Sequence, residues 1–383
     1  MRVCYFGTYD ESFPRNRVLI QGLLENGAQV LRCQAKLWSG TQDKITGVKG
    51  FRPASGGLAL SLLHRMAKSY LQLWREHRRV GPYDIMVVGY AGHLDVLRAW
   101  VLTRLRRKPL VFDAFLSLYD TVVEDRKLIR PGSILARGLW LLDKVSCSLA
   151  DLVFLDTQVH IDWYSERYGL KKERFRRVLA GAEALEIHGL ANQHNSNPFK
   201  VLYFGNFIPL HGVEHILGAA RELRGHNDIS FELVGEGQTY DEAQRLAQDN
   251  GLSNVRFIHG WFPTSELANR VREAAVCLGI FGTGKKADLV IPQKVAFSLA
   301  LGRPVLTRDS PAVREVFTPG RDIMVCQAGS PQSLAASILA LKGDAALRRD
   351  IAQEGYRRFQ ESFCPKAIGK SVKEILTTLC EVG

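Results

Sequence analysis

The chain of 383 residues contains the same opening twice. Val3-Cys-Tyr-Phe-Gly7 and Val201-Leu-Tyr-Phe-Gly205 are each an apolar run that ends in glycine and leads through a loop into a helical pattern. A buried strand, a glycine turn and a helix form the first unit of a parallel α/β sheet, in which helices cover both faces. The repeated opening therefore predicts two separate α/β units.

Short apolar segments alternate with helical patterns through both halves of the chain. Strands that alternate with helices in this way are typical of a parallel, helix-covered sheet. We predict the α/β fold class, with two doubly wound, Rossmann-like domains that face each other across a cleft. After the two opening strands, the predicted strands are 28–33, 84–89, 109–113 and 152–156 in the first half, and 230–234, 255–258, 276–280, 304–307 and 323–325 in the second.

A polar, turn-rich and aperiodic segment, 186–199, separates the two units. We predict that it links an N-terminal domain over 1–185 to a C-terminal domain over 200–364. The last segment, 365–383, follows a helix break near Pro365, and we expect it to form a helix that packs back on the N-terminal domain. Ligands of such folds bind beyond the carboxyl ends of the strands, so we expect them in the cleft.

Composition argues against several classes of protein. The chain is 46% hydrophobic and 23% charged, which is ordinary for a globular protein. No apolar stretch approaches the roughly 18 to 20 residues of a spanning helix, and the N-terminus predicts a buried strand in place of a signal peptide. Seven cysteines are scattered without a C-x-x-C or a zinc-type spacing. We expect a cytoplasmic protein with reduced cysteines and no metal site.

The net charge of +12 lies mostly in the first half. Residues 1–190 hold 29 Lys and Arg against 19 Asp and Glu, whereas 191–383 hold 22 against 20. An anionic partner is therefore expected for the first half, and nucleic acid, an anionic membrane surface and phosphorylated substrates are the candidates. No nucleic-acid-binding module accompanies the charge, which disfavours nucleic acid.

Glycine-rich turns follow two predicted strands of the second half. Gly205-Asn-Phe-Ile-Pro-Leu-His-Gly212 precedes a helix near Val213, so its amides can hold a phosphate. Val234-Gly-Glu-Gly237 stands in the same position after the next strand. Such glycines can equally serve only to turn the chain.

The segment from Leu278 to Thr307 has the most informative pattern. A predicted strand ends in Gly282-Thr-Gly-Lys-Lys286, Pro292 begins a short helix, and Gly302 ends it. Amide donors and lysines at the start of that helix favour a diphosphate ligand.

Four of these motifs together resemble one family. The order of segments over about 200–350 resembles the C-terminal half of the retaining GT-B glycosyltransferases of glycosyltransferase family 4. Residues 1–185 resemble this family only in architecture. The motifs that carry the resemblance are Gly205 to Gly212, Val234 to Gly237, Asn254-Val-Arg-Phe-Ile-His-Gly260, and Pro292-Gln-Lys-Val with the following Leu-Ala-x-Gly-Arg-Pro-Val305.

The resemblance implies a nucleotide-sugar donor bound by the C-terminal domain, an acceptor bound by the N-terminal one, and transfer with retention. It implies no metal and no cofactor beyond the nucleotide diphosphate sugar itself. The donor-binding residues that we predict are Gly205, Asn206, His211, Gly212, Glu236, Gly237, Lys286, Lys294 and Glu315.

The chain departs from the family pattern at several positions. Asn206 and His211 stand in the loop where the family has an Arg and a Lys for the donor phosphates. Leu289 and Phe297 stand where the family has two glutamates, which hold the sugar and the ribose. Asp288 is one residue from the first of these positions and is a possible substitute. Altered donor handling or lost activity is therefore an open alternative.

Carboxylates and a histidine follow predicted strands of the first half. Asp113 ends one strand and His93 follows another, and we predict both as catalytic residues. Asp120, Asp125 and Arg126 lie in the loop or helix that follows Asp113, and we predict that they bind the acceptor. Helix capping, a structural histidine and solvated charge are the alternatives for these residues.

The segment 58–79 has apolar residues at helical spacing and arginines along one edge, and 104–108 adds a second basic cluster. An amphipathic helix of this kind can meet an anionic lipid surface, although a helix packed on the sheet with a solvated edge explains the pattern equally well. A peripheral position on the inner face of the cell membrane is one possible localisation.

The sequence thus predicts a glycosyltransferase that moves a sugar from a nucleotide diphosphate donor to a glycan or lipid-linked acceptor, in cell-surface polysaccharide or glycoconjugate synthesis. The alternatives are a non-catalytic GT-B-like binding or regulatory subunit, which Leu289 and Phe297 motivate, and an epimerase that acts on a nucleotide sugar.

Overall fold

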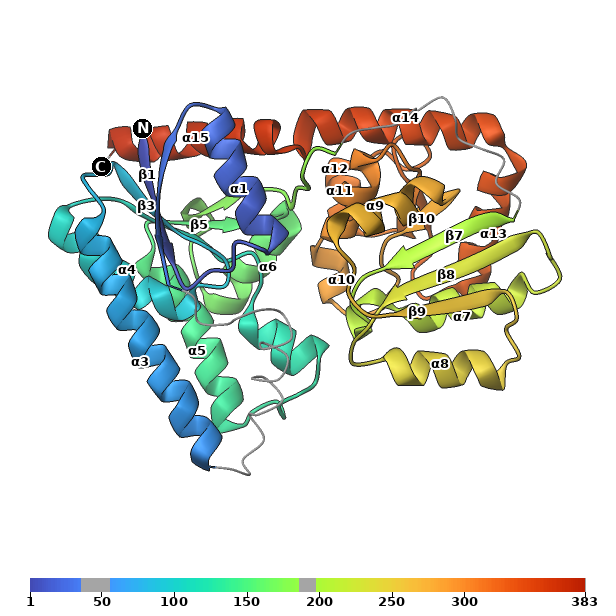
Figure 1. The fold of residues 1–383 in the computed structure, drawn as a ribbon, viewed down its shortest axis with the longest axis horizontal. Helices are drawn as coiled ribbons and strands as arrows, with labels where there is room; N and C mark the ends of the chain where they lie inside the picture. The colour runs from blue at the N-terminus through green and yellow to red at the C-terminus, as the bar shows by residue number, and fades with distance from the viewer. Residues whose placement is uncertain (36–55, 186–197, 383) are drawn as a thin grey trace.

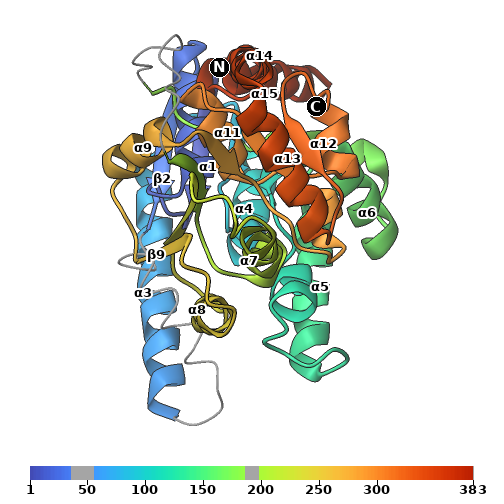
Figure 2. The ribbon, with the colours of Figure 1, turned by 90° about the vertical axis from the view of Figure 1, so that its right-hand side faces the viewer.

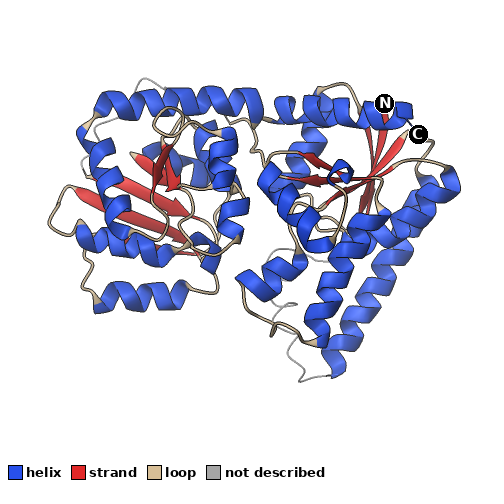
Figure 3. Cartoon of the chain, turned by 180° about the vertical axis from the view of Figure 1, so that it is seen from behind, coloured by secondary structure: helices blue, strands red, loops and turns tan. Residues whose placement is uncertain are grey.

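Two α/β domains lie side by side, and two consecutive helices run along the top of both (Figure 1). The computed structural model describes residues 1–35, 56–185 and 198–382. Most of the predicted linker, 186–197, lies outside these residues. In each domain the sheet is in the middle and helices cover both of its faces (Figure 3).

The N-terminal sheet has six parallel strands in the order β2-β1-β3-β4-β5-β6. Successive side chains of its central strands are all buried, because helices cover both faces. The strands are β1 (Arg2–Gly7), β2 (Gln29–Gln34), β3 (Ile85–Val88), β4 (Leu110–Asp113), β5 (Leu152–Leu155) and β6 (Phe175–Arg177). The helices are α1 (Pro14–Glu25), α3 (Gly56–Arg79), α4 (His93–Arg106), α5 (Ile134–Leu149) and α6 (Gln158–Tyr168), with a π-helical turn η1 (Asp120–Asp125) and a 3-10 turn η2 (Lys172–Arg174).

The C-terminal sheet has six parallel strands in the order β12-β11-β10-β7-β8-β9. The strands are β7 (Phe199–Phe204), β8 (Ile229–Gly235), β9 (Val255–His259), β10 (Val276–Leu278), β11 (Val305–Arg308) and β12 (Met324–Cys326). The helices are α7 (Val213–Glu222), α8 (Tyr240–Asp249), α9 (Thr264–Glu273), α10 (Lys286–Leu289), α11 (Gln293–Ala300), α12 (Pro311–Val316), α13 (Pro331–Gly343), α14 (Ala345–Ser362) and α15 (Pro365–Val382), with a 3-10 turn η3 (Pro209–His211).

The predicted α/β fold of two doubly wound domains is confirmed. Every predicted strand is present, and its ends lie within two residues of the expected ones. The prediction missed β6, whose sequence Phe-Arg-Arg has one buried residue and two exposed ones. Such a short edge strand leaves no apolar run for sequence analysis to detect.

The last helix of the chain belongs to the N-terminal domain. α14 lies over the C-terminal domain, and α15 continues from it across α1 (Figures 1 and 2). The apolar face of α15, with Ile368, Val372 and Leu376, is buried in the same core as Val18 and Leu19 of α1. The chain therefore returns to the first domain after completing the second.

No helix among the described residues combines the length and the apolar character that crossing a bilayer requires.

The crossing of α1 and α15 requires glycine on both helices. A Cβ atom at Gly369 would lie 2.0 Å from the backbone oxygen of Gly22, so any larger residue must push the helices apart. We expect Gly369→Leu to lower the free energy of unfolding by about 1 to 3 kcal/mol, measured by urea unfolding.

Gly138 of α5 is the matched control, because a Cβ atom there meets nothing within 4 Å. Gly138→Ala should leave the free energy of unfolding unchanged or raise it by up to about 1 kcal/mol. An equal effect of both substitutions would contradict the close crossing.

Candidate functional site

The strand order of the C-terminal sheet reverses direction between β7 and β10, and the carboxyl edge of the sheet at this switch point is called the crevice below. The chain proceeds from β7 to β9 in one direction and resumes at β10 on the other side of β7. The loops that follow β7 and β10 therefore lead away on opposite faces, and ligands of open α/β sheets bind at such a point.

Two loops meet in this crevice at backbone distance. Gly212 has a φ of 61°, and a Cβ atom there would lie 2.4 Å from the amide nitrogen of Gly282. The amide of Phe281 donates a hydrogen bond of 3.0 Å to the carbonyl of His211. Gly235, with a φ of 140°, approaches the carbonyl of Gly205 so closely that a Cβ atom would lie 1.9 Å from it. The predicted turns at Gly205 and Gly212 are thus sites of close backbone approach.

Lys294 of α11 extends its side chain into the same crevice. Only 8% of the residue is exposed, and its Nζ lies 3.3 Å from His211 Nδ1 and 4.0 Å from the ring centre of Tyr203. The ammonium lies so close to Gly205 that a Cβ atom there would be 3.3 Å from Nζ. No carboxylate of the described residues forms an ion pair with it, and burial holds the pKa of Lys294 well below its ordinary value.

His211 is held next to this lysine by the loop itself. Its Nδ1 contacts the carbonyl oxygen of Asn206 and lies 2.8 Å from the hydroxyl of Tyr203, which donates to the same carbonyl at 2.6 Å. Burial, the charge of Lys294 and the charge of Arg126 together hold the pKa of His211 well below its ordinary value. The imidazole is therefore neutral at physiological pH.

Arg126 approaches the crevice from the N-terminal domain. It follows η1, and its loop is fixed to the C-terminal domain by a hydrogen bond of 3.0 Å from Gln238 Nε2 to its carbonyl. Burial lowers the pKa of Arg126, and the neighbouring Asp125 and Tyr90 oppose this change. Asp125 is itself half-buried beside Lys286 and Arg126, and burial raises its pKa despite these cations. Two cations, Lys294 and Arg126, thus flank His211 from the two domains.

Three aromatic rings form a cluster at the carboxyl edge of the N-terminal sheet. Phe13 and Tyr90 have ring centres 4.8 Å apart, and Phe115 lies 5.3 Å from Tyr90. Tyr90 interacts electrostatically with Arg126, which places this cluster next to the crevice. Our sequence prediction missed these residues, although Tyr90 and Phe115 each follow the end of a strand by two residues.

Lys286 and Asp120 form an ion pair between the domains. Nζ of Lys286 lies 2.9 Å from Asp120 Oδ2 and donates to Thr121 Oγ1 at 2.6 Å. Both charged side chains are buried. We predicted that Lys286 binds the donor and that Asp120 binds the acceptor, but in this structure the two side chains neutralise each other.

Glu315 also serves the contact between the domains. Its carboxylate accepts hydrogen bonds of 2.7 and 2.8 Å from the amide of Gln158 and one of 3.2 Å from that of Val159, at the start of α6. Arg177 adds an ion pair of 2.8 Å. Glu315 therefore caps a helix of the other domain, whereas we predicted that it binds the donor.

Asp113 is fully buried, and Arg15 occupies both of its carboxylate oxygens. The guanidinium donates three hydrogen bonds of 2.7 to 3.2 Å to them and two more to the carbonyls of Val178 and Leu179. A carboxylate with these partners is not free to accept a proton from a ligand. The structure therefore assigns Asp113 to the core of the domain and does not favour the catalytic role that we predicted.

His93 is likewise part of a buried network. Its Nε2 lies 3.2 Å from Asp143, whose carboxylate also accepts from Ser117, Tyr168 and the amide of Tyr119. Burial would raise the pKa of Asp143, but the hydrogen bond and charge of His93 and these donors hold it below its ordinary value. The network positions the loop before η1, so a structural role fits His93 better than the predicted catalytic one.

Glu236 and Gly237 lie at the end of the neighbouring strand, β8. The Oε1 atom of Glu236 accepts a hydrogen bond of 2.6 Å from the indole of Trp261, which is half exposed after β9. Gly237, with a φ of 149°, packs on the backbone of Phe207. Trp261 is a further candidate ligand contact that our sequence prediction missed.

The two positions that lack the expected glutamates hold apolar packing residues. Leu289 is buried, and Phe297 packs its ring 5.7 Å from that of Phe204. Asp288, the possible substitute, forms an ion pair of 2.6 Å with Arg308. Among the described residues, no group of three or more His, Cys, Asp or Glu side chains is arranged to hold a metal ion.

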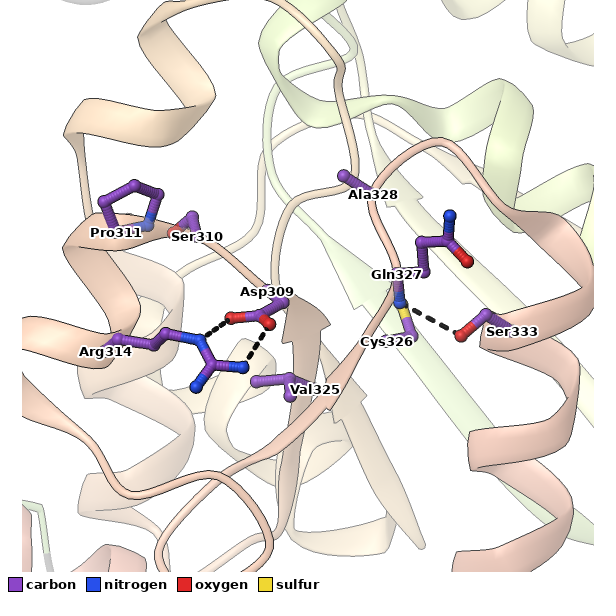
Figure 4. A pocket seen from close by; sticks show the side chains of 9 residues that line it. All are labelled: Asp309, Ser310, Pro311, Arg314, Val325, Cys326, Gln327, Ala328 and Ser333. Carbon is purple, nitrogen blue, oxygen red and sulfur yellow. Dashed lines mark hydrogen bonds and ion pairs between the residues drawn. The ribbon is translucent and has the colours of Figure 1, made fainter.

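A separate open cavity of about 680 Å³ lies at the carboxyl ends of β11 and β12 (Figure 4). Asp309 and Arg314 form an ion pair of 2.6 Å on one side of it, and Gln327 and Ser333 line the other. None of the predicted site residues lines this cavity.

Comparison with known proteins finds glycosyltransferases similar to the second half of the chain. Residues 190–358 match the family model described as "Glycosyl transferases group 1". The lipopolysaccharide core biosynthesis glycosyltransferase LpsE of Rhizobium meliloti is 25% identical over 179 residues, which are 46% of this chain and 49% of that protein. An uncharacterized glycosyltransferase of Methanocaldococcus jannaschii is 22% identical over 185 residues, 45% and 48% of the two chains. The chain spans about half the length of the curated relatives it matches.

Solved structures match over the whole chain. Sucrose-phosphate synthase of Thermosynechococcus elongatus has a TM-score of 0.72 at 17% identity and covers 100% of this chain and 99% of its own. HepE of Anabaena, in complex with UDP and glucose, has a TM-score of 0.67 at 15% identity, with 99% and 100% coverage. At such low identity these matches show the fold alone, which is GT-B.

Replacing the buried ammonium should stabilise the free protein. Lys294→Met keeps an unbranched side chain and removes the charge, so we expect the free energy of unfolding at neutral pH to rise by about 1 kcal/mol. The pKa of Lys294 is lower in the folded than in the unfolded state, so the unfolded chain binds more protons between these two pKa values. Wild-type stability therefore rises with pH in this interval, and the advantage of the Met variant shrinks.

Urea unfolding of both proteins at neutral and alkaline pH measures this difference. Lys200→Met is the control, because Lys200 is partly exposed and paired with Glu273 at 2.9 Å. A Lys294→Met protein that is less stable than wild type at neutral pH would show that the ammonium has a stabilising partner.

Proposed function

We propose that this protein is a glycosyltransferase that moves a sugar from a nucleotide diphosphate sugar to a glycan or lipid-linked acceptor. The observation that carries the proposal is the buried ammonium of Lys294, which pairs with no carboxylate in the described part of the chain and lies at the crevice of the C-terminal sheet. A buried cation without an ion pair favours the binding of an anionic ligand, and a diphosphate has two charged groups that can contact it. The match of residues 190–358 to glycosyl transferases group 1 and the UDP bound by HepE of the same fold support this choice.

The chemistry that we propose depends on positioning and charge. The charges of Lys294 and Arg126 both act on His211, so a diphosphate bound there would gain charge-assisted hydrogen bonds if it reached both side chains. Negative charge on the diphosphate increases as its bond to the sugar breaks. Fixed cations in the crevice would stabilise this charge. With two cations in place, we propose that transfer proceeds without a metal ion. Retention of configuration follows from the resemblance to family 4.

The acceptor would lie on the N-terminal side of the same crevice. Asp125 and the aromatic rings of Phe13, Tyr90 and Phe115 adjoin Arg126, and a carboxylate beside aromatic faces is suited to sugar hydroxyls and to the apolar face of a sugar ring. Two relatives are named for lipopolysaccharide core and putative colanic acid biosynthesis, which supports a place in cell-surface glycan synthesis.

A non-catalytic subunit of the same architecture is the second candidate. Leu289 and Phe297 favour it, because neither can hydrogen-bond a sugar or a ribose. Slow hydrolysis of a nucleotide sugar to free nucleotide would support the enzyme. Transfer of the sugar to an acceptor would also support it. Nucleotide binding without any turnover would support the subunit.

Lys294 should dominate the affinity for nucleotide diphosphates. We expect titration calorimetry with UDP, GDP and ADP to show binding of one of them, and Lys294→Met to weaken it by at least about tenfold, since a charge-assisted hydrogen bond is lost. Lys200→Met, at the opposite end of β7, should bind as wild type does. Absence of binding to every nucleotide would reject the donor site.

Arg126 distinguishes a donor role from an acceptor role. If its guanidinium contacts the diphosphate, Arg126→Gln should weaken nucleotide binding by roughly tenfold and raise the KM for the donor. If Arg126 binds only the acceptor, as the sequence predicted, nucleotide affinity should stay at the wild-type value. Arg130→Gln, an exposed arginine of the same loop, is the control.

A further inference from the structure

The N-terminal domain exposes an unusual number of large apolar side chains on one layer of helices. Of the fourteen exposed large hydrophobic residues in the described part of the chain, eleven lie on α3, α4, α5 or the loop before α5. Such residues are normally scattered singly over a surface, and their concentration marks an interaction site.

α4 carries this apolar surface as a continuous stripe. Leu94, Leu97, Val101 and Leu105 are all exposed, Leu105 by 78%, and their spacing of three, four and four residues places them on one face of the helix. Val96, Ala99 and Thr103 of the same helix are buried on the opposite face. α4 is therefore apolar on both sides, whereas packing on the sheet requires only one apolar face.

α5 repeats this arrangement. Ile134 is 90% exposed and Leu141 is 55% exposed, seven residues apart and thus on the same face two turns further. The buried face of α5 contains Ala136, Asp143 and Cys147.

The three helices lie next to one another in one layer. Arg98 of α4 lies 3.3 Å from the ring centre of Tyr70 on α3, and Ser146 of α5 donates a hydrogen bond of 2.9 Å to the carbonyl of His93 at the start of α4. Figure 2 shows α4 between α3 and α5, and the free ends of α3 and α5 extend beyond the domain in the same direction.

Basic side chains border the apolar stripes. The charged residues exposed on α4 and α5 are arginines, Arg98, Arg104, Arg106 and Arg137, while the two acidic residues of these helices, Asp95 and Asp143, are buried. On α3, Arg75 and Arg78 flank the exposed indole of Trp74. An apolar stripe with basic edges is the pattern of a helix that lies in the interface of an anionic bilayer.

We propose that the exposed layer of α3, α4 and α5 is a docking surface for an anionic phospholipid bilayer. A second copy of the chain is disfavoured, because a two-fold interface through this layer would bring arginine edges against each other. Residues of the crevice, such as Arg126, are not part of this surface. The inference goes beyond the proposed transfer reaction and does not require it, but it gives a lipid-linked acceptor a route to the N-terminal domain.

Vesicle sedimentation of the full chain tests the proposal. We expect binding to vesicles of phosphatidylcholine mixed with phosphatidylglycerol, weaker binding as salt is added, and little binding to phosphatidylcholine alone. Val101→Asp combined with Leu105→Asp should lower the partition coefficient at least about tenfold, since both apolar contact and charge attraction are lost.

The matched control replaces exposed leucines outside the layer. Leu24→Asp combined with Leu246→Asp, on α1 and α8, should bind vesicles as wild type does, and thermal unfolding should show that both double variants fold. Equal vesicle binding by the two double variants, or no binding by wild type, would overturn the proposal. A dimer in sedimentation equilibrium that Val101→Asp with Leu105→Asp dissociates would assign the surface to a second copy instead.

Discussion

The buried ammonium of Lys294 is the constraint around which the C-terminal site is organised. A cation removed from water without a carboxylate is unfavourable, and the contacts of this ammonium among the described residues are a ring face and an imidazole, without an ion pair. The loop can approach this closely because Gly205, Gly212 and Gly282 lack side chains. The unpaired ammonium thus lowers the free energy of unfolding, and it remains available to pair with an anion. Such a cost in stability is typical of preorganised binding sites.

Features that depend on short stretches of sequence could be predicted, whereas contacts between distant residues could not. Strands, turns and the position of Lys294 depend on patterns within about 30 residues, namely apolar runs, glycines and a proline before a helix, and these predictions agree with the structure. Charged residues were predicted less well. Lys286 meets Thr121 from 165 residues away, Glu315 meets Gln158 from 157 residues away, and Arg15 meets Asp113 from 98 residues away. A single sequence does not show which distant partner neutralises a given charge.

The contact between the domains explains why so many predicted ligand residues turned out to be occupied. In the strand-end loops of both domains, charged side chains pair with groups of the opposite domain. Asp120, Lys286 and Glu315 form such contacts, whereas Arg126 lies beside its sequence neighbour Asp125 and no carboxylate of the described residues forms an ion pair with Lys294. The contacts of Asp120, Lys286 and Glu315 therefore hold the two domains together.

The position of α15 has a consequence for how this protein is made. The apolar face of α1 is buried by a helix that follows it by more than 300 residues, so the first domain cannot complete its core while the ribosome is still synthesising the second. Domains generally fold as units in order of synthesis, but here the C-terminal domain becomes able to finish first. Until α15 emerges, the part of the core around Val18, Leu19 and Leu23 that this helix completes stays uncovered.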